Sequence, residues 1–314
     1  MTTENPAAGN PGPGSPSRMA EGIALHRFAE SMLPEDVRIF FDPYAIHFID
    51  PAMLAWAREH PAEAKAIAED FERRMPGWSN SIRARIRYFD DVVQNAAGEG
   101  FTQLVIFGAG YDTRAYRIDS IRDRINVFEI DRAATQQKKL AILAKIPGLR
   151  PAPVAFVPQD IGQENSWNAL VKAGFSPAAK TLFILEGLVM YLPREAVDAL
   201  LAGIAGIGGG GSAVLFDFIP QSLADGTSGA EGGREIRAYT IAVGEPIRSG
   251  FLPGEIVPFL TRLGFSGVQI ITSTAYGKMY FHGKNADRNV SGLLSLAYAV
   301  LPGRGPASGR ESEA

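Results

Sequence analysis

The sequence predicts an α/β fold in which a mostly parallel sheet is covered by helices on both faces. From about residue 101 onward, short β-rich runs alternate with helical patterns, as repeated strand–helix–strand units require. The run at 181–185 is apolar on both faces, which is typical of a central strand in a parallel sheet. With 314 residues and 46% apolar residues, the chain is long enough for one large domain or a domain with an added cap.

The region before residue 98 is predicted to consist of a tail and a helical cap. Residues 1–18 are rich in proline, glycine, serine and asparagine and predict a disordered tail. Residues 19–97 predict a helical cap that packs on the main domain, with part of it also covering a ligand, and 40–45 form a turn between helices. The apolar positions that recur at helical spacing include Ala24, Phe28, Met32, Trp56, Ile67 and Phe71.

Residues 98–302 are expected to form the sheet domain, followed by a flexible tail at 303–314. The predicted strands are 103–107, 125–130, 154–157, 181–185, 213–218 and 267–272. The predicted helices are at about 132–146, 164–173, 194–206, 233–243 and 254–263. Residues 221–233 are rich in glycine and serine, and such a long loop is expected to be a lid or a disordered segment.

Composition narrows the classes of partner. A net charge of −3 and a pI near 5.9 give no general attraction to nucleic acid or anionic lipid. The chain has no cysteine, and its histidines lack metal-ligand spacing, so no metal site is expected. Neither a signal peptide nor an apolar run of membrane-spanning length is apparent, and a cytoplasmic protein acting on a small molecule is expected.

The first predicted strand runs into a glycine turn, Gly108-Ala109-Gly110. Two glycines let a backbone approach a ligand closely and adopt dihedral angles closed to other residues. The third glycine of the dinucleotide-binding fingerprint is missing, because position 113 is threonine. The turn alone is equally compatible with a plain strand-to-helix connection.

The second predicted strand ends with two acids, Glu129 and Asp131, about twenty residues beyond the glycine turn. Nucleotide-binding Rossmann folds place an acidic residue there, on the ribose hydroxyls. Alternation along a strand points both side chains to the same side, so either acid could bind ribose. The alternative is a solvated carboxylate at a strand end.

The helix before the first strand carries an inward-facing arginine. Ile82, Ile86, Phe89, Val92, Val93 and Ala96 form one apolar stripe at helical spacing. Arg85 falls within this stripe, whereas Arg83 and Arg87 point to the far side. Because a lone buried charge is costly, Arg85 needs an acidic partner. That partner is either a protein carboxylate in a structural salt bridge or the carboxylate of an amino-acid-like cofactor.

Further candidates follow the third and fourth strands, where open α/β sheets bind ligands. Asp160 and Ile161 suit a hydrogen bond to a base amine and apolar cover for its ring. Glu186 lies among apolar residues and could face a cationic group. Tyr191 could pack on a ligand or offer its hydroxyl.

In combination, these segments resemble the leucine carboxyl methyltransferase family, which includes protein phosphatase methyltransferases and tetracenomycin-type polyketide methyltransferases. The similarity runs from about residue 27 to 265 and rests on the order and spacing of several motifs. They are Phe41-Asp42-Pro43-Tyr44-Ala45, Arg85-Ile86-Arg87-Tyr88-Phe89-Asp90-Asp91, Gly108-Ala109-Gly110-Tyr111-Asp112-Thr113-Arg114, Phe128-Glu129-Ile130-Asp131 and Glu186-Gly187-Leu188-Val189-Met190-Tyr191-Leu192.

The resemblance implies a Rossmann-like class I methyltransferase fold that uses S-adenosylmethionine. It implies Arg85 as the clamp on the methionine carboxylate, Gly108 and Gly110 as the backbone approach, Asp131 on ribose, Asp160 and Ile161 on adenine, and Glu186 near the amino group and sulfonium. Ala109, Asp112 and Glu129 in the same motifs are included as cofactor-binding candidates, and Tyr191 and Glu186 as catalytic candidates. Ile86 stands between the paired arginines, where the family usually has a small residue. The tail after Thr272 also differs from that of the protein-methylating members. These two differences leave the identity of the substrate open.

The expected reaction is O-methylation of a carboxylate, or of a hydroxyl, on a small molecule. A carboxylate is already ionised at pH 7 and needs no general base, whereas a phenol would need one. Two alternatives remain: an NAD-dependent dehydrogenase built on the same sheet, and a non-catalytic module that binds S-adenosylmethionine. The sequence leaves open the acceptor and the oligomeric state.

Overall fold

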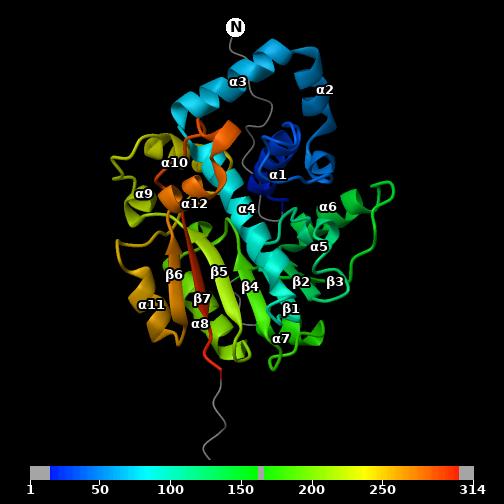
Figure 1. Ribbon diagram of the computed structural model, residues 1–314, viewed down its shortest axis with the longest axis vertical. Helices are drawn as coiled ribbons and strands as arrows, with labels where there is room; N and C mark the ends of the chain where they lie inside the picture. Colours follow the sequence, from blue (N-terminus) through cyan, green and yellow to red (C-terminus); the bar gives the residue numbers. More distant parts are fainter. Residues whose placement is uncertain (1–14, 162–165, 304–314) are drawn as a thin grey trace, which may run out of the picture.

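The computed structural model describes residues 15–161 and 166–303. Its sheet has seven strands in the order β3-β2-β1-β4-β5-β7-β6 (Figure 1). The strands are β1 Gln103–Phe107, β2 Asn126–Asp131, β3 Val154–Pro158, β4 Thr181–Leu185, β5 Ala213–Phe218, β6 Ser266–Ile271 and β7 Ser295–Val300. Strands β1 to β5 pair in parallel, and β7 runs antiparallel to both β5 and β6. The predicted mostly parallel α/β sheet is confirmed.

Both faces of the sheet are covered, because successive side chains of the central strands enter different apolar clusters. In β1, Leu104 and Ile106 belong to one cluster and Val105 and Phe107 to the other. The first cluster includes residues of α4 (Trp78–Ala96) and α12 (Ser273–Tyr280). The second includes residues of α7 (Ser166–Lys172), α8 (Arg194–Ile207) and α11 (Ile256–Arg262). Every residue of β4 is buried, as expected for a central strand.

The remaining helices connect the strands or extend the domain at one end. They are α5 Arg114–Arg117, α6 Ala133–Leu143, the 3₁₀ turn η2 Val189–Tyr191, α9 Gln221–Asp225, α10 Gly233–Ala242 and η3 Gly283–Asn285. Residues of α9 and α10 form a smaller apolar cluster with Met75 and Met190. None of the helices in the described ranges is long and apolar enough to cross a membrane.

The predicted N-terminal cap consists of α1 (Arg18–Ser31), η1 (Ala45–Phe48), α2 (Pro51–Glu59) and α3 (Pro61–Arg74), which gather at one end of the molecule (Figure 1). Helices α2 and α3 bury none of their residues, so the expected packing of Trp56 and Ile67 on the main domain is wrong. Met32 is also exposed. By contrast, α4 supplies Ile82, Ile86, Phe89, Val93 and Ala96 to the core beside the sheet, and therefore packs as a layer of the sheet domain.

The structure also changes the predicted boundaries and elements. Ser17 and Arg18, assigned to the tail, are the N-cap and the first residue of α1. Strand β7 and helix α12 were missed, because this part of the sequence was interpreted as a divergent tail. Part of the predicted 221–233 loop is helical, as α9 begins at Gln221. The rest of the predicted tails, at 1–14 and 304–314, lies outside the described residues, as does the start of the 164–173 helix.

Candidate cofactor and active site

A crevice of about 340 Å³ opens at the carboxyl ends of β1, β2 and β4, where ligands bind in open α/β sheets. Its size lies within the range of small-molecule pockets. We call it the cofactor crevice. Every predicted site residue except Glu129 lines it: Arg85, Gly108, Ala109, Gly110, Asp112, Asp131, Asp160, Ile161, Glu186 and Tyr191.

The glycine turn after β1 forms the floor of the crevice in a conformation that needs glycine. Gly108 has a φ of 63° and Gly110 a φ of 48°, in the left-handed region that side chains disfavour. A Cβ at Gly108 would lie 3.0 Å from Leu188, and one at Gly110 would lie 3.1 Å from Ala20 of α1. The bare backbone therefore serves two purposes here: it makes the turn, and it admits close neighbours.

Asp131, the last residue of β2, holds the glycine turn against the second strand. Its Oδ2 accepts a hydrogen bond from the Gly110 amide at 2.5 Å, and its Oδ1 accepts one from the Arg132 amide at 2.6 Å. Burial raises the pKa of this carboxyl above its ordinary value. No cation in the described ranges forms an ion pair with Asp131. Its carboxylate retains free lone pairs that can accept hydroxyl donors from the crevice.

Glu129 is a correction to the predicted site. It is fully buried and paired with Lys139 of α6, which is also fully buried, and it does not line the crevice. The physical reason is its place two residues before the strand end, beneath α6, instead of at the open edge. The alternation argument gave the correct side of the strand for both acids, but only the terminal acid reaches the edge.

Arg85 is buried and lines the crevice, with acidic partners on two of its nitrogens. Its Nη1 donates to Asp217 Oδ2 at 2.7 Å, and its Nε to Glu186 Oε1 at 3.1 Å. Burial lowers the pKa of Arg85, but the two carboxylates outweigh burial and raise it overall. Nη2 has no acceptor among the described residues and is not sealed from the crevice. Arg85 thus forms a structural salt bridge with protein carboxylates and still keeps one donor, Nη2, for a ligand.

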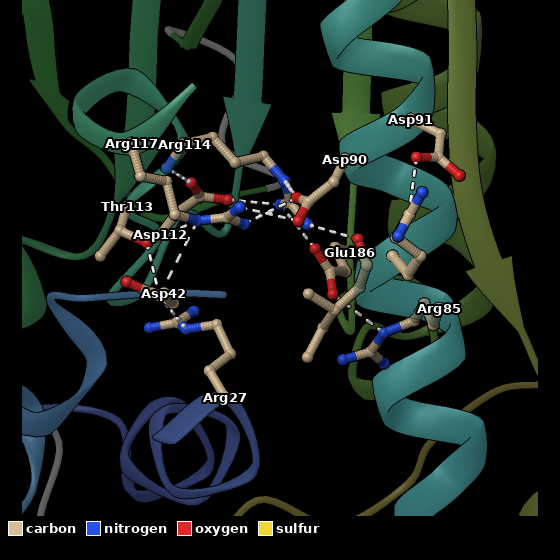
Figure 2. Close-up of polar contacts among 12 residues, drawn as sticks. Arg27, Asp42, Arg85, Asp90, Asp91, Asp112, Thr113, Arg114, Arg117 and Glu186 are labelled. Atoms are coloured by element: carbon tan, nitrogen blue, oxygen red, sulfur yellow. Dashed lines mark hydrogen bonds and ion pairs between the residues drawn. The ribbon is translucent and has the colours of Figure 1, made fainter. Parts of the chain in front are cut away.

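A buried ion-pair network extends from Glu186 away from Arg85 (Figure 2). Arg114 lies between three carboxylates: Glu186 and Asp112 at 2.6 Å, and Asp90 at 2.7 Å. Arg117 shares Asp90 at 2.7 Å, and Arg27 pairs with Asp42 at 2.9 Å. Burial raises the pKa of Asp112, but the positive charges of Arg114, Lys139 and Arg117 and the hydrogen bond from the Arg114 amide together outweigh burial and hold it at about 2. This network fixes the carboxyl groups of Asp112 and Glu186 in place at the crevice wall.

The two predicted catalytic residues differ in what they can do. Burial raises the pKa of Tyr191 well above its ordinary value, so its hydroxyl stays protonated at neutral pH and can donate a hydrogen bond but not accept a proton. Both carboxylate oxygens of Glu186 already pair with arginines, Oε1 with Arg85 and Oε2 with Arg114. A catalytic role for either residue stays a prediction.

The crevice also includes residues that the sequence did not indicate. Ser17, Met19 and Ala20 at the start of α1 line it, as do Gly244, Glu245, Pro246 and Arg248. Asp217, near the end of β5, is fully buried behind Arg85. Asp217 is an acid near the end of an apolar strand beside β4, and this pattern could have marked it as a candidate site residue. The lining residues at the start of α1 and around Glu245 lie far along the chain from the other motifs, and their sequence carried no comparable signal.

The fold and the crevice together define a class I methyltransferase architecture. A solved protein from Thermobifida fusca YX, provisionally described as a methyltransferase, matches with a TM-score of 0.59 and 15% identity, over 96% of this chain and 100% of that chain. A DUF574 family protein from Streptomyces avermitilis MA-4680 matches with a TM-score of 0.60 and 14% identity, over 91% and 98%. At these identities the likeness concerns the fold alone.

The family follows from the sequence. A family model described as leucine carboxyl methyltransferase matches residues 20–205. A Mycolicibacterium smegmatis protein, provisionally named an S-adenosyl-L-methionine-dependent methyltransferase, is 33% identical over 235 residues, which cover 73% of this chain and 70% of the relative. YktD of Bacillus subtilis, named in the same way, is 31% identical over 217 residues, covering 68% and 70%. The chain belongs to the leucine carboxyl methyltransferase family.

Proposed function

We propose that this protein, an S-adenosylmethionine-dependent methyltransferase, methylates a carboxylate oxygen of a small-molecule acceptor and produces a methyl ester. The observation that carries the proposal is the lack of a suitable base: neither histidine nor lysine occurs among the described residues that line the crevice. Tyr191 stays protonated, and both oxygens of Glu186 are engaged by arginines. A hydroxyl acceptor would need a base near neutral pH, whereas a carboxylate already carries its negative charge.

The residues of the crevice fit the cofactor. The glycine turn presents bare backbone, Asp131 has lone pairs for ribose hydroxyls, and Arg85 has Nη2 for a carboxylate. Asp160 and Ile161 line the same crevice and would contact the adenine, and Glu186 would face the ammonium group. When bound, S-adenosylmethionine supplies an electrophilic methyl group on a positively charged sulfur.

The charge of the buried network also suits a cationic ligand. Around Arg27, Arg85, Arg114 and Arg117, the ion pairs involve the carboxylates of Asp42, Asp90, Asp112, Glu186 and Asp217. In formal charges this network has one more carboxylate than guanidinium. A ligand that brings one net positive charge compensates that excess, which supports a sulfonium cofactor over a neutral or anionic one.

The contribution of the protein to the reaction would be mainly positional. Alignment of two reacting groups can supply up to ~7–11 kcal/mol of the barrier. The start of α1 and the segment around Glu245 both line the crevice and are hydrogen-bonded to each other, and with a ligand bound they would help to exclude water from the reacting groups. Tyr191, with its hydroxyl protonated, would orient the acceptor by donating a hydrogen bond. The family description, which names a carboxyl group as the methyl acceptor, supports the same reaction.

The test is methyl transfer from isotopically labelled S-adenosylmethionine to a panel of carboxylic acids and matched phenols. Methyl esters release volatile labelled methanol in mild base, whereas methyl ethers do not. We expect base-labile label on an acid, and base-stable label on a phenol would contradict the carboxylate assignment. If S-adenosylhomocysteine bound but no acceptor were methylated, a non-catalytic module would be favoured. Thermal stabilisation by NADH alone would favour a dehydrogenase.

A further inference from the structure

Asp217 lies behind the cofactor crevice and does not line it. It is the second-to-last residue of β5, and its side chain is fully buried. Arg85, its partner, comes from α4 and does line the crevice. Any influence of Asp217 on a ligand must therefore pass through another residue.

The carboxylate of Asp217 joins two separate elements. Its Oδ2 accepts from Arg85 Nη1 at 2.7 Å, and its Oδ1 accepts from the Gly187 amide at 2.6 Å. Gly187 lies in the turn after β4 and has a φ of 61°. Asp217 thus fixes the arginine of α4 relative to the backbone turn that forms the crevice wall.

Two of the three nitrogens of the Arg85 guanidinium are bound by protein carboxylates. Glu186 binds Nε and Asp217 binds Nη1, while Nη2 has no acceptor in residues 15–161 or 166–303. The Gly187 turn packs against the group so closely that a Cβ there would lie 3.3 Å from Nη1 and 3.4 Å from Nη2. Glu186 cannot fix this orientation by itself, because its other oxygen is bound to Arg114.

We propose that Asp217 is a positioning residue for the carboxylate of the cofactor: it holds the Arg85 guanidinium so that Nη2 points into the crevice. This inference rests on the proposed cofactor site. Asparagine at position 217 would offer one acceptor oxygen and one amide donor where two donors, Gly187 N–H and Arg85 Nη1–H, now point. The guanidinium would then lose its fixed orientation while the crevice kept its size.

The experiment compares two ligands that differ only in the carboxylate: S-adenosylhomocysteine and its decarboxylated analogue. In isothermal titration, Asp217→Asn is expected to raise the Kd for S-adenosylhomocysteine about tenfold, the effect of one charge-assisted hydrogen bond. The Kd for the decarboxylated analogue is expected to change less than twofold. The matched control is Asp91→Asn, which removes another Arg–Asp contact of α4, the Arg87–Asp91 pair, away from the network (Figure 2); it should alter neither Kd.

A double-variant cycle tests whether Asp217 acts through Arg85. In an Arg85→Met background, adding Asp217→Asn should cause no further loss of S-adenosylhomocysteine affinity. A merely structural role predicts equal weakening of both ligands, and this result would overturn the proposal. Unchanged binding of S-adenosylhomocysteine to Asp217→Asn would overturn it as well.

A second variant keeps the test open if Asp217→Asn does not fold. Gly187→Ala retains both charges but strains the turn, whose φ is 61°, and pushes against the guanidinium; it should weaken the carboxylate-bearing ligand more than the decarboxylated one. If Gly187→Ala weakened both ligands equally, the proposal would be wrong. All these measurements are of binding, so they can succeed even if no methyl acceptor is found, and a failed transfer assay does not affect them.

Discussion

Ser17 and Glu245 connect two segments that both line the crevice: Ser17 Oγ lies 2.8 Å from Oε1 and 3.1 Å from Oε2 of Glu245. The same carboxylate accepts from the backbone amides of Arg18 at 2.9 Å and Met19 at 3.2 Å. On the other side, the Ser17 amide donates to Thr135 of α6 at 3.3 Å. An acid at a helix N-terminus satisfies amides that have no partner within the helix. The start of α1 is therefore held by hydrogen bonds to Glu245 and to α6.

This contact is predicted to slow the exchange of the cofactor. Because the start of α1 and Glu245 both line the crevice, Glu245→Ala should speed dissociation of S-adenosylhomocysteine by about tenfold, in line with the loss of a charge-assisted helix cap. Stopped-flow displacement of a fluorescent analogue measures this rate. Glu231→Ala, which removes an exposed acid that does not line the crevice, is the control. An unchanged dissociation rate in Glu245→Ala would show that cofactor exchange does not require this contact to open.

Substitution of each acid of β2 distinguishes the two ribose-binding candidates. Asp131→Asn should weaken S-adenosylhomocysteine binding by about 10- to 100-fold, because the loss of a charged acceptor costs about 1.5–3 kcal/mol. Glu129→Gln should change stability and leave the affinity nearly unaltered, since Glu129 pairs with Lys139 outside the crevice. Titration calorimetry on both variants provides the comparison. Equal affinity losses would contradict the assignment of ribose to Asp131.

Two glycines of α8 should respond in opposite directions to alanine. A Cβ at Gly203 would meet the Trp167 ring at 2.3 Å, whereas one at Gly206 would meet nothing within 4 Å. Gly203→Ala should lower the free energy of unfolding by about 1–3 kcal/mol through overpacking. Gly206→Ala should raise it by about 0.5–1 kcal/mol through helix propensity. Chemical denaturation measures both, and stabilisation by Gly203→Ala would mean that the indole moves freely.

His26 predicts a pH dependence of stability. Burial, together with the positive charges of Arg83 and Arg85, lowers the pKa of His26 from 6.5 to about 3. The unfolded chain therefore binds a proton between about pH 6.5 and pH 3 where the folded protein does not. Above pH 6.5 His26 is neutral in both states and has no effect on the free energy of unfolding, which then falls as the pH drops from 6.5 toward 3. The free energy of unfolding of His26→Gln should fall less steeply across that window, and a slope identical to that of the native protein would refute the shift.

Much of the crevice was predictable because its residues follow short buried strands. The individual parallel strands, the glycine turn and the acid at the end of β2 are local features, and parallel strands bring their carboxyl ends to one edge. Helical periodicity placed Arg85 inside correctly, since α4 packs along the sheet with a continuous apolar stripe. Periodicity gave the wrong result for Trp56 of α2 and Ile67 of α3, which stay exposed, whereas Phe71 near the end of α3 packs against the apolar cluster of α9 and α10.

By itself, the sequence determined the sheet, the glycine turn, the inward position of Arg85 and the candidate set for a charged nucleoside cofactor. Only the tertiary structure decided between Asp131 and Glu129, brought Asp217 behind Arg85, and fastened Ser17 to Glu245. The physical reason is distance along the chain: the partners of each contact are set by how helices and strands pack, and no local pattern encodes that packing. Strand periodicity fixes the side to which a carboxylate points, whereas its partner depends on the element that lies against it.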